Sequence, residues 1–323
     1  WGESLLPHFW EDFAGDAPGI IFTVWDASRL FWFGAPGYLP EDNEITDFLC
    51  SDKFQRWGYF PIDGLGPGQK LSILSAETVE GYDRVLAYSQ FGRDVLGRTL
   101  GKRPDFIPHL IDHDTFQPRD PKVGRESLGF EPQHKVVGCV MTNQFRKDWG
   151  VWAETAALLL KKDKNYRFWI HTNILEKHWS IYALLADFGL EKHVKVTQPC
   201  TDKNLSFYYS ACDITVLPSL GEGFGYPLAE SLACGTPAIH HDYAAGGEIL
   251  PYDWKIETGP YFRLDTLHNI YRPVLVAEEF ADKIHHTIKH EEHTPEEIRA
   301  FVSHLFWPNL APTWMRWFRD GLK

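Results

Sequence analysis

Short apolar runs alternate with longer segments of helical periodicity along much of the chain. In the first third, Ile20–Trp25 and Arg84–Ser89 have the length and composition of buried strands, and Gln90–Leu100 has the pattern of a helix. Residues 34–68 are rich in Gly, Pro and Asp, which predicts loops with short elements. Residues 112–134 hold five Pro and Gly residues, so this segment is the best candidate for a linker.

After residue 134 the alternation of strand and helix patterns becomes regular. The predicted strands are Lys135–Val140, Tyr166–His171, Val194–Thr197, Asp213–Leu217 and Pro237–His240. The predicted helices are Trp149–Lys162, His178–Phe188, Asp202–Ala211, Pro227–Cys234 and Val276–His290. Asp148 is a suitable N-cap for the first of these helices. Strands that alternate with helices in this way indicate a doubly wound parallel sheet.

The end of the chain has two further helical patterns. Thr294-Pro-Glu-Glu297 has the spacing of a capping box with Pro at the first helical position. A last segment from residue 308 onward carries its apolar residues on one helical face, namely Leu310, Trp314, Trp317 and Phe318. We expect this face to pack back onto the first domain rather than to lie on a membrane surface.

Composition narrows the class of protein. The 323 residues suffice for two domains, and 44% hydrophobic with 24% charged residues is typical of a globular protein. A formal net charge of −12 disfavours binding to nucleic acid, although it leaves a local basic groove open. Since no window approaches about 18 consecutive apolar residues, we expect no transmembrane helix. The five cysteines form no CxxC pair, which indicates reduced thiols in a cytoplasmic protein.

The most informative segment is Pro218–Leu250, which reads PSLGEGFGYPLAESLACGTPAIHHDYAAGGEIL and follows a predicted strand. Its Gly-rich loop leads into a helix, and ligands bind at such carboxyl ends of parallel strands. The free N–H groups and the dipole of a helix N-terminus suit an anion, and glycines let the backbone approach a ligand closely. Glu222 in the loop and Glu230 in the helix can hold hydroxyl groups through charge-assisted hydrogen bonds.

At these residues the sequence resembles the large family 4 of retaining glycosyltransferases, also described as glycosyltransferase group 1. The pattern E-G-F-G-x-P-x-x-E-S-x-A-C-G-T-P looks like the family signature, in which two glutamates have seven residues between them. Other segments are similar to family elements in the same order, namely VLAYSQFGRDVL, IPHLIDHDTFQP, NQFRKDW and NLSFYYSACDITVLPS. The resemblance spans roughly residues 80–290.

The resemblance implies a role for each residue of the motif. Glu230 matches the glutamate that binds the ribose hydroxyls of the donor. Glu222 matches the glutamate that orients hydroxyls of the transferred sugar. Gly223, Phe224 and Gly225 match the segment whose backbone N–H groups face the sugar and the phosphates.

Two cations outside the motif also match family positions. Lys147 matches the lysine that neutralises the diphosphate, and Arg146 stands beside it. Both precede a helix start at the end of a predicted strand, where fixed cations can stabilise a departing nucleoside diphosphate without a metal. We therefore expect no metal and no cofactor. The histidine-rich segments His240-His241-Asp242 and 285–293 match no standard set of metal ligands.

The sequence departs from the family pattern in three places. Thr142 and Asn143 stand where an arginine is usual, so either the phosphates have fewer contacts or Arg146 takes that role. We expect Asn143 to contribute to donor binding. Trp25 occupies the place of a family histidine and leaves Asp26 as the nearest polar substitute. The family's first strand and Gly-rich loop have no counterpart, so we expect the N-terminal domain to be incomplete.

The resemblance implies the GT-B form of the α/β class, in which two Rossmann-like domains face each other across a cleft. We expect an N-terminal acceptor-side domain at residues 1–120 and a nucleotide-sugar-binding domain at residues 121–305. Residues 306–323 then form the helix that packs back on the N-terminal domain.

The implied activity is that of a retaining hexosyltransferase. It would move a hexose from a nucleoside-diphosphate sugar to the hydroxyl of a carbohydrate, lipid-linked or other acceptor. One alternative is a non-catalytic or partner-dependent protein of the same fold that binds sugar nucleotides. Another is a transferase that uses modified DNA as acceptor, which the acidic charge disfavours.

Overall fold

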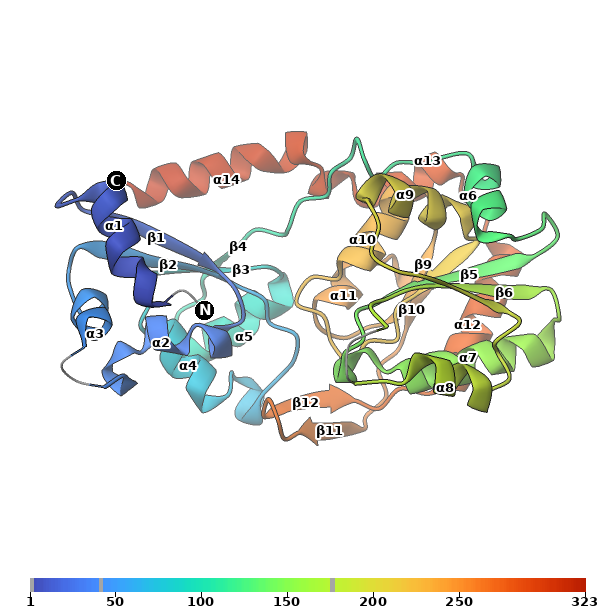
Figure 1. The fold of residues 1–323 in the computed structure, drawn as a ribbon, viewed down its shortest axis with the longest axis horizontal. Helices are drawn as coiled ribbons and strands as arrows, with labels where there is room; N and C mark the ends of the chain where they lie inside the picture. The colour runs from blue at the N-terminus through green and yellow to red at the C-terminus, as the bar shows by residue number, and fades with distance from the viewer. Residues whose placement is uncertain (1–2, 41–42, 175–177) are drawn as a thin grey trace. The chain divides into compact units, whose positions relative to one another are not determined.

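The protein is described by a computed structural model that covers residues 3–40, 43–174 and 178–323 (Figure 1). Its internal contacts divide the chain into two compact units. The first unit consists of residues 1–108 and 264–272, and the second consists of residues 109–263 and 273–323. The roles expected for the acceptor-side and donor-side domains, with their boundary at residue 120, stay predictions.

The first unit is built on a parallel sheet with the strand order β1-β2-β3-β4. Its strands are β1 (Gly19–Val24), β2 (Phe54–Phe60), β3 (Arg84–Ala87) and β4 (Asp105–Phe106). Its helices are α1 (Leu6–Ala14), α2 (Phe31–Gly34), α3 (Glu44–Leu49), α4 (Ile73–Glu80) and α5 (Gln90–Leu100). Single 3-10 turns lie at Glu3–Leu5, Ala27–Arg29, Pro36–Tyr38 and Pro67–Gln69. The predictions of β1, β3 and α5 are confirmed.

Strand β2 was not predicted, although it lies in the centre of this sheet. It pairs with β1 on one side and with β3 on the other. Its segment FQRWGYF contains a glycine and stands in a Gly- and Pro-rich region, which favoured a loop. The glycine is needed because a Cβ at Gly58 would lie 2.3 Å from the ring of Phe60 and 2.8 Å from that of Tyr82. Packing therefore overrides the local propensity at this position.

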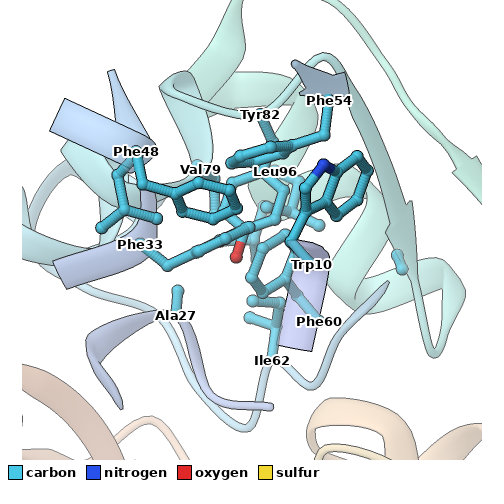
Figure 2. Close-up of a cluster of buried hydrophobic side chains, with 13 residues drawn as sticks. Trp10, Ala27, Phe33, Phe48, Phe54, Phe60, Ile62, Val79, Tyr82 and Leu96 are labelled. Carbon is cyan, nitrogen blue, oxygen red and sulfur yellow. The ribbon is translucent and has the colours of Figure 1, made fainter. Parts of the chain in front are cut away.

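Aromatic rings fill the core of the first unit (Figure 2). The Trp10 ring lies 5.4 Å from that of Phe54, which lies 5.0 Å from that of Phe48. The Arg56 guanidinium covers the same cluster, 5.0 Å from the Phe54 ring centre and 5.3 Å from that of Phe33. Such tilted rings and a covering cation stabilise a core beyond the burial of its apolar area.

Residues 264–272 join the first unit from far along the sequence. Strands β11 (Phe262–Asp265) and β12 (Ile270–Pro273) form a two-stranded sheet of their own. The Tyr271 N–H donates to the Leu65 carbonyl at 2.7 Å. The buried Arg272 guanidinium donates to the backbone carbonyl of Asp63 at 2.7 Å and to its carboxylate at 3.1 Å. The sequence predicted no element here, because its stabilising partners lie about 200 positions earlier.

The second unit contains the doubly wound sheet that the sequence predicted. All its strand pairs are parallel, and the order is β10-β9-β8-β5-β6-β7. The strands are β5 (Lys135–Val140), β6 (Tyr166–His171), β7 (Val194–Thr197), β8 (Ile214–Val216), β9 (Ala238–His241) and β10 (Lys255–Ile256). The first five are confirmed within one or two residues, and β10 was not predicted.

Helices cover both faces of this sheet. Figure 1 shows α6, α9 and α10 on one face and α7, α8 and α12 on the other. The helices of the second unit are α6 (Pro121–Leu128), α7 (Trp149–Lys162), α8 (Ile181–Asp187), α9 (Asp202–Ala211), α10 (Tyr226–Ala233), α11 (Ala244–Ile249), α12 (Ala277–His290), α13 (Pro295–Ala300) and α14 (Trp307–Gly321). Further 3-10 turns lie at Phe145–Lys147, Tyr252–Trp254 and Ser303–Leu305. Helix α8 begins three residues later than predicted, at Ile181.

The interpretation of residues 112–134 as a linker was wrong, because α6 lies within this segment. The Asp120 side chain accepts from the Lys122 N–H as N-cap, and Pro121 takes the first helical position. Gly129 ends the helix with a φ of 71°. Asp120, Pro121 and Gly129 are thus the ordinary start and stop signals of a short helix.

The C-terminal helices follow the sequence patterns closely. The capping box is confirmed, since the Glu297 N–H donates to the Thr294 hydroxyl and the Glu297 carboxylate accepts from the Thr294 N–H. On α14, Leu310 and Trp317 are buried. The packing of α14 on the first domain stays a prediction. Among the described residues, no helix combines the length and apolar character that a membrane span requires.

Candidate active site

The order of the strands in the second unit creates a switch point between β5 and β8. Strands β6 and β7 follow on one side of β5, whereas β8, β9 and β10 lie on its other side. The loops that leave β5 and β8 therefore diverge from the carboxyl ends of two neighbouring strands, which is where open α/β sheets bind ligands. The first loop carries Arg146 and Lys147, and the second carries Glu222.

These two loops are held together by hydrogen bonds. The Leu220 N–H donates to the Arg146 carbonyl at 2.8 Å. In the other direction, the Arg146 guanidinium donates to the Gly221 carbonyl at 2.8 Å and to the Ser219 hydroxyl at 3.3 Å. Arg146 thus fixes the course of the glutamate loop in addition to carrying a charge.

The side chains of Lys147 and Glu222 meet in the interior as an ion pair. Each residue is only 5% exposed, and the Lys147 ammonium donates to Glu222 Oε1. Arg146 Nη1 lies 3.2 Å from the same oxygen. Burial alone would raise the pKa of Glu222, but the two cations hold it well below its usual value. Glu222 is therefore a carboxylate. Burial lowers the pKa of Lys147, against the raising effect of Glu222. With Lys147 protonated in the ion pair, the three side chains together carry one net positive charge.

The local structure around β5 explains why Lys147 points inward. Phe145–Lys147 forms a 3-10 turn, and Asp148 follows it with a φ of 35°. The Asp148 carboxylate accepts from the Val151 N–H at 3.2 Å and so caps α7. This sharp start of α7 directs Lys147 into the interior.

Asn143 belongs to the same loop but has a structural role there. Its side-chain NH₂ donates to the Trp179 carbonyl at 2.9 Å, and its side-chain oxygen accepts from the Trp179 N–H at 3.0 Å. Because Asn143 is fully buried, both bonds replace lost contacts with water. A direct contact of the Asn143 side chain with a donor stays a prediction, and these bonds tie the loop after β5 to residue 179.

Glu230 lies on α10, one element away from Glu222. The Tyr209 hydroxyl donates to Glu230 Oε2 at 2.8 Å. Burial raises the pKa of Glu230 to about 7, against the lowering effect of that hydrogen bond. The two glutamates of the motif therefore differ in charge state, since Glu222 is ionised and Glu230 titrates near neutral pH.

The start of α10 depends on the glycine that precedes it. Gly225 is the N-cap and has a φ of 104°, a conformation that residues with a Cβ rarely adopt. Phe224 is buried, Gly223 is half-buried and Tyr226 is exposed. From α11, which follows β9, the Ala245 N–H donates to the Glu222 carbonyl at 3.2 Å. The segments that follow β5, β8 and β9 thus meet around Glu222.

Sequence reasoning missed two polar residues of this site. Ser219 accepts from Arg146 and lies three positions before Glu222. Tyr209 is the partner of Glu230. Both lie inside segments that resemble the family, but serine and tyrosine are common in ordinary cores, so nothing local distinguished them.

One trio of potential metal ligands exists among the residues that the structure describes. Atoms of Asp112, His113 and Asp114 lie within 4.8 Å of one another. The Asp112 carboxylate already accepts from the Asp114 N–H at 3.1 Å and from the Thr115 hydroxyl at 2.6 Å, which is the usual role of aspartate in a turn. The expectation that the protein needs no metal stays a prediction.

Known sequences resemble about half of this chain. Residues 124–250 match the family model described as "Glycosyl transferases group 1". The D-inositol 3-phosphate glycosyltransferase 2 of Catenulispora acidiphila is 28% identical over 174 residues, which are 50% of this chain and 41% of that protein. A D-inositol 3-phosphate glycosyltransferase of Frankia alni is 28% identical over 184 residues, which are 54% of this chain and 45% of that protein. The chain thus spans less than half of the length of these curated relatives.

Solved structures extend the likeness over nearly the whole chain. Sucrose-phosphate synthase from Thermosynechococcus elongatus has a TM-score of 0.75 at 18% identity and covers 99% of this chain and 77% of its own. Anabaena HepE in complex with UDP and glucose has a TM-score of 0.69 at 16% identity and covers 94% of this chain and 77% of its own. These likenesses confirm the expected α/β fold of the GT-B class, and residues 124–250 match the sequence model of the glycosyl transferases group 1.

Proposed function

We propose that this protein transfers a hexose from a nucleoside-diphosphate sugar to an acceptor hydroxyl, with retention of anomeric configuration. The observation that carries the proposal is the convergence of Arg146 and Lys147 on Glu222 at the switch point of a parallel sheet. A net positive charge at this place suits the diphosphate of a donor, and the ionised glutamate suits the hydroxyls of its sugar.

The proposed reaction breaks the bond between the anomeric carbon and the phosphate oxygen. A bond from that carbon to the acceptor oxygen forms on the same face, and the acceptor proton passes to the departing diphosphate. Arg146 and Lys147 stabilise the negative charge that develops on the leaving group. Because the pKa of Glu222 is held low, this residue accepts hydrogen bonds from sugar hydroxyls and does not act as a general acid.

Further support comes from the second glutamate and from the relatives. Glu230 lies on α10, five residues after Gly225, and by sequence it matches the family's ribose-binding glutamate. The HepE structures contain UDP and glucose, so uridine nucleotides are the first donors to test. The five cysteines are unpaired, which supports a reducing compartment such as the cytoplasm. The acceptor class includes carbohydrates, lipid-linked sugars and other hydroxyl compounds.

Calorimetry with UDP, GDP, ADP and TDP tests donor binding directly. We expect one of the four to bind, and binding of none would contradict the proposal. Proton NMR of the transfer product from the matching sugar nucleotide then reports the anomeric configuration. Inversion would contradict the retaining mechanism alone. Binding without transfer to any acceptor would favour the non-catalytic alternative, and transfer only to hydroxymethylated duplex DNA would favour the DNA alternative.

A further inference from the structure

Strand β9 ends in two histidines that are entirely enclosed. His240 is 0% exposed and His241 is 1% exposed. The Nδ1 atom of His240 bonds to the carbonyl of Leu217. The Nε2 atom of His241 bonds to the carbonyl of Ser219 at 2.6 Å. Leu217 and Ser219 begin the loop that presents Glu222, so both rings contact the backbone of the glutamate loop.

The chemistry of these bonds determines the protonation of each ring. A carbonyl oxygen only accepts, so the proton must sit on Nδ1 of His240 and on Nε2 of His241. The remaining nitrogens, Nε2 of His240 and Nδ1 of His241, are buried and have no hydrogen-bond partner among the described residues. A second proton there would be a buried donor without an acceptor, which is costly. Neighbouring histidines are thus neutral and in opposite tautomers.

Burial also favours the neutral form of both rings. It lowers the pKa of His241 to about 4, against the raising effects of the Ser219 bond, Glu222 and Asp242. The pKa of His240 is well below its usual value for the same reason. Both rings therefore stay neutral through the physiological range.

We infer that His240 and His241 are positioning residues, which hold the loop from Leu217 to Gly221 by N–H donors from opposite ring nitrogens and thereby set the place of Glu222. The carbonyls of Leu217 and Ser219 lie in the interior, where an acceptor without a partner is unfavourable. The Ser219 hydroxyl continues the chain of bonds, since it donates to the Gly221 carbonyl at 3.2 Å. The position of the glutamate loop thus depends on rings that touch no substrate.

The surroundings of His240 show that its ring has little freedom. A Cβ at Gly246 would lie 2.5 Å from Nε2 and from Cδ2 of this ring. A side chain at that position would displace the ring, so the glycine after β9 serves this packing. The His240 and His241 rings are 4.2 Å apart, which couples the positions of the two donors.

The kinetic consequence of this inference rests on the proposed function, but its geometry can be tested without any activity. In the folded wild-type chain labelled with ¹⁵N-histidine, two-bond NMR correlations distinguish the two neutral tautomers. We expect one buried ring with the proton on Nδ1 and one with the proton on Nε2 at pH 7. The variants H240N and H241Q assign the two signals. Identical tautomers, or a doubly protonated ring, would overturn the inference whether or not the protein binds a nucleotide.

Amide side chains provide a matched test of function. The asparagine amide can replace an Nδ1 donor and the glutamine amide an Nε2 donor, so His241→Gln and His240→Asn should keep the loop in place. His241→Asn shortens the reach of the amide by one methylene, and His240→Gln lengthens it by one. These two variants should therefore not keep the loop in place. With UDP-glucose as donor, we expect a fall in kcat of at least tenfold in the mismatched variants, with KM changed less than threefold. The matched variants should stay within threefold of the wild type.

The outcomes separate this inference from the proposed function. Equal kcat values in matched and mismatched variants that remain folded by circular dichroism would contradict a positioning role. If the wild type neither binds UDP nor transfers glucose, the proposed function fails for this donor, and the tautomers still decide the inference. If a mismatched variant does not fold, the wild-type NMR spectrum and the matched variant remain decisive.

Discussion

Lys147 and Glu222 form a buried ion pair that links the loops after β5 and β8. Although 75 positions separate the two residues in the sequence, the pairing of β5 with β8 and the hydrogen bonds between the loops bring them together. In this structure the carboxylate already neutralises one of the two cations assigned to the diphosphate. Arg146, whose side chain is 28% exposed, supplies the remaining charge. The site is therefore attractive to an anion without leaving an uncompensated ammonium group in the interior.

Removal of the lysine should affect both binding and folding. We expect Lys147→Ala to weaken UDP binding by about 1.5–3 kcal/mol, the range for a hydrogen bond to a charged group. The variant also leaves Glu222 with Arg146 alone, and a broken buried pair costs about 3–5 kcal/mol of stability at most. Calorimetry and urea unfolding measure the two effects separately.

The double variant Lys147→Met with Glu222→Gln is the matched control for this change. It removes the buried charge together with its partner, so part of the lost stability should return while UDP binding stays weak. An unchanged affinity for UDP in folded Lys147→Ala would remove this lysine from the donor site.

Arg146→Ala should weaken UDP binding by a similar amount, about 1.5–3 kcal/mol. In addition, it removes the donors to the Gly221 carbonyl and the Ser219 hydroxyl, so the glutamate loop loses part of its support. Arg146→Lys keeps the charge without these paired bonds. If affinity follows charge alone, the lysine variant should bind UDP as the wild type does, and a loss there would show that the loop contacts matter.

The two glutamates should separate in steady-state kinetics. Glu230→Gln should chiefly raise the dissociation constant of the donor, because a ribose contact is nearly uniform between ground and transition states. Glu222→Gln should chiefly lower kcat, since this residue is proposed to contact the reacting sugar. The opposite pattern in a chain that transfers sugar would show that the two roles are exchanged.

Much of the second unit could be predicted from the sequence because its signals are local. Asp148 as N-cap and the residues directly after it define α7, and the capping box at Thr294 defines the start of α13 in the same local way. In contrast, β2 and β12 are stabilised by partners distant in sequence. Gly58 of β2 suggested a loop in the sequence, but the rings of Phe60 and Tyr82 leave no space for a Cβ at this position.

The candidate site shows the same division between local and distant information. The motif pointed to Glu222 and Glu230, and family resemblance pointed to Lys147. The ion pair between Lys147 and Glu222 depends on the adjacency of β5 and β8, which no local pattern encodes. Likewise, no local pattern indicated that the Asn143 amide bonds to the backbone of Trp179, and its expected contact with the donor stays a prediction.

The conformation of Gly225 gives a test of the loop that precedes α10. We expect Gly225→Ala to cost about 1–2 kcal/mol, because its φ of 104° is unfavourable for a residue with a Cβ. The cause is backbone strain rather than a clash, since a Cβ there would meet its nearest atoms at 3.4 Å. Gly259→Ala is the control, because that position is open and should change stability little. Equal unfolding midpoints for the two variants would contradict this argument.

The affinity for donor should depend on pH through Glu230. Its pKa is raised from 4.5 to about 7 by burial, so the free protein holds a neutral carboxyl group below that pH. A carboxylate accepts ribose hydroxyls more strongly than a carboxylic acid does. Affinity for UDP-glucose should therefore rise as the pH increases from 6 to 8 and fall up to tenfold for each unit below 7. UDP-glucose is the suitable ligand, because it lacks the terminal phosphate that titrates near pH 6 in UDP.

Two variants show whether Glu230 causes this dependence. Glu230→Gln should bind more weakly and lose most of the pH dependence between 6 and 8. Tyr209→Phe removes the hydrogen bond that lowers the pKa of Glu230, so the pH midpoint of its UDP-glucose binding should move to higher pH.

The pH dependence of the unfolding free energy gives an independent check on Glu230. A carboxyl group with a raised pKa stabilises the fold below pH 4.5 relative to higher pH, and this contribution is lost as the pH rises through 7. As the pH rises from 5 to 8, Glu230→Gln should thus gain stability relative to the wild type. If the pH midpoint of UDP-glucose binding is unchanged in Tyr209→Phe, a group other than Glu230 titrates.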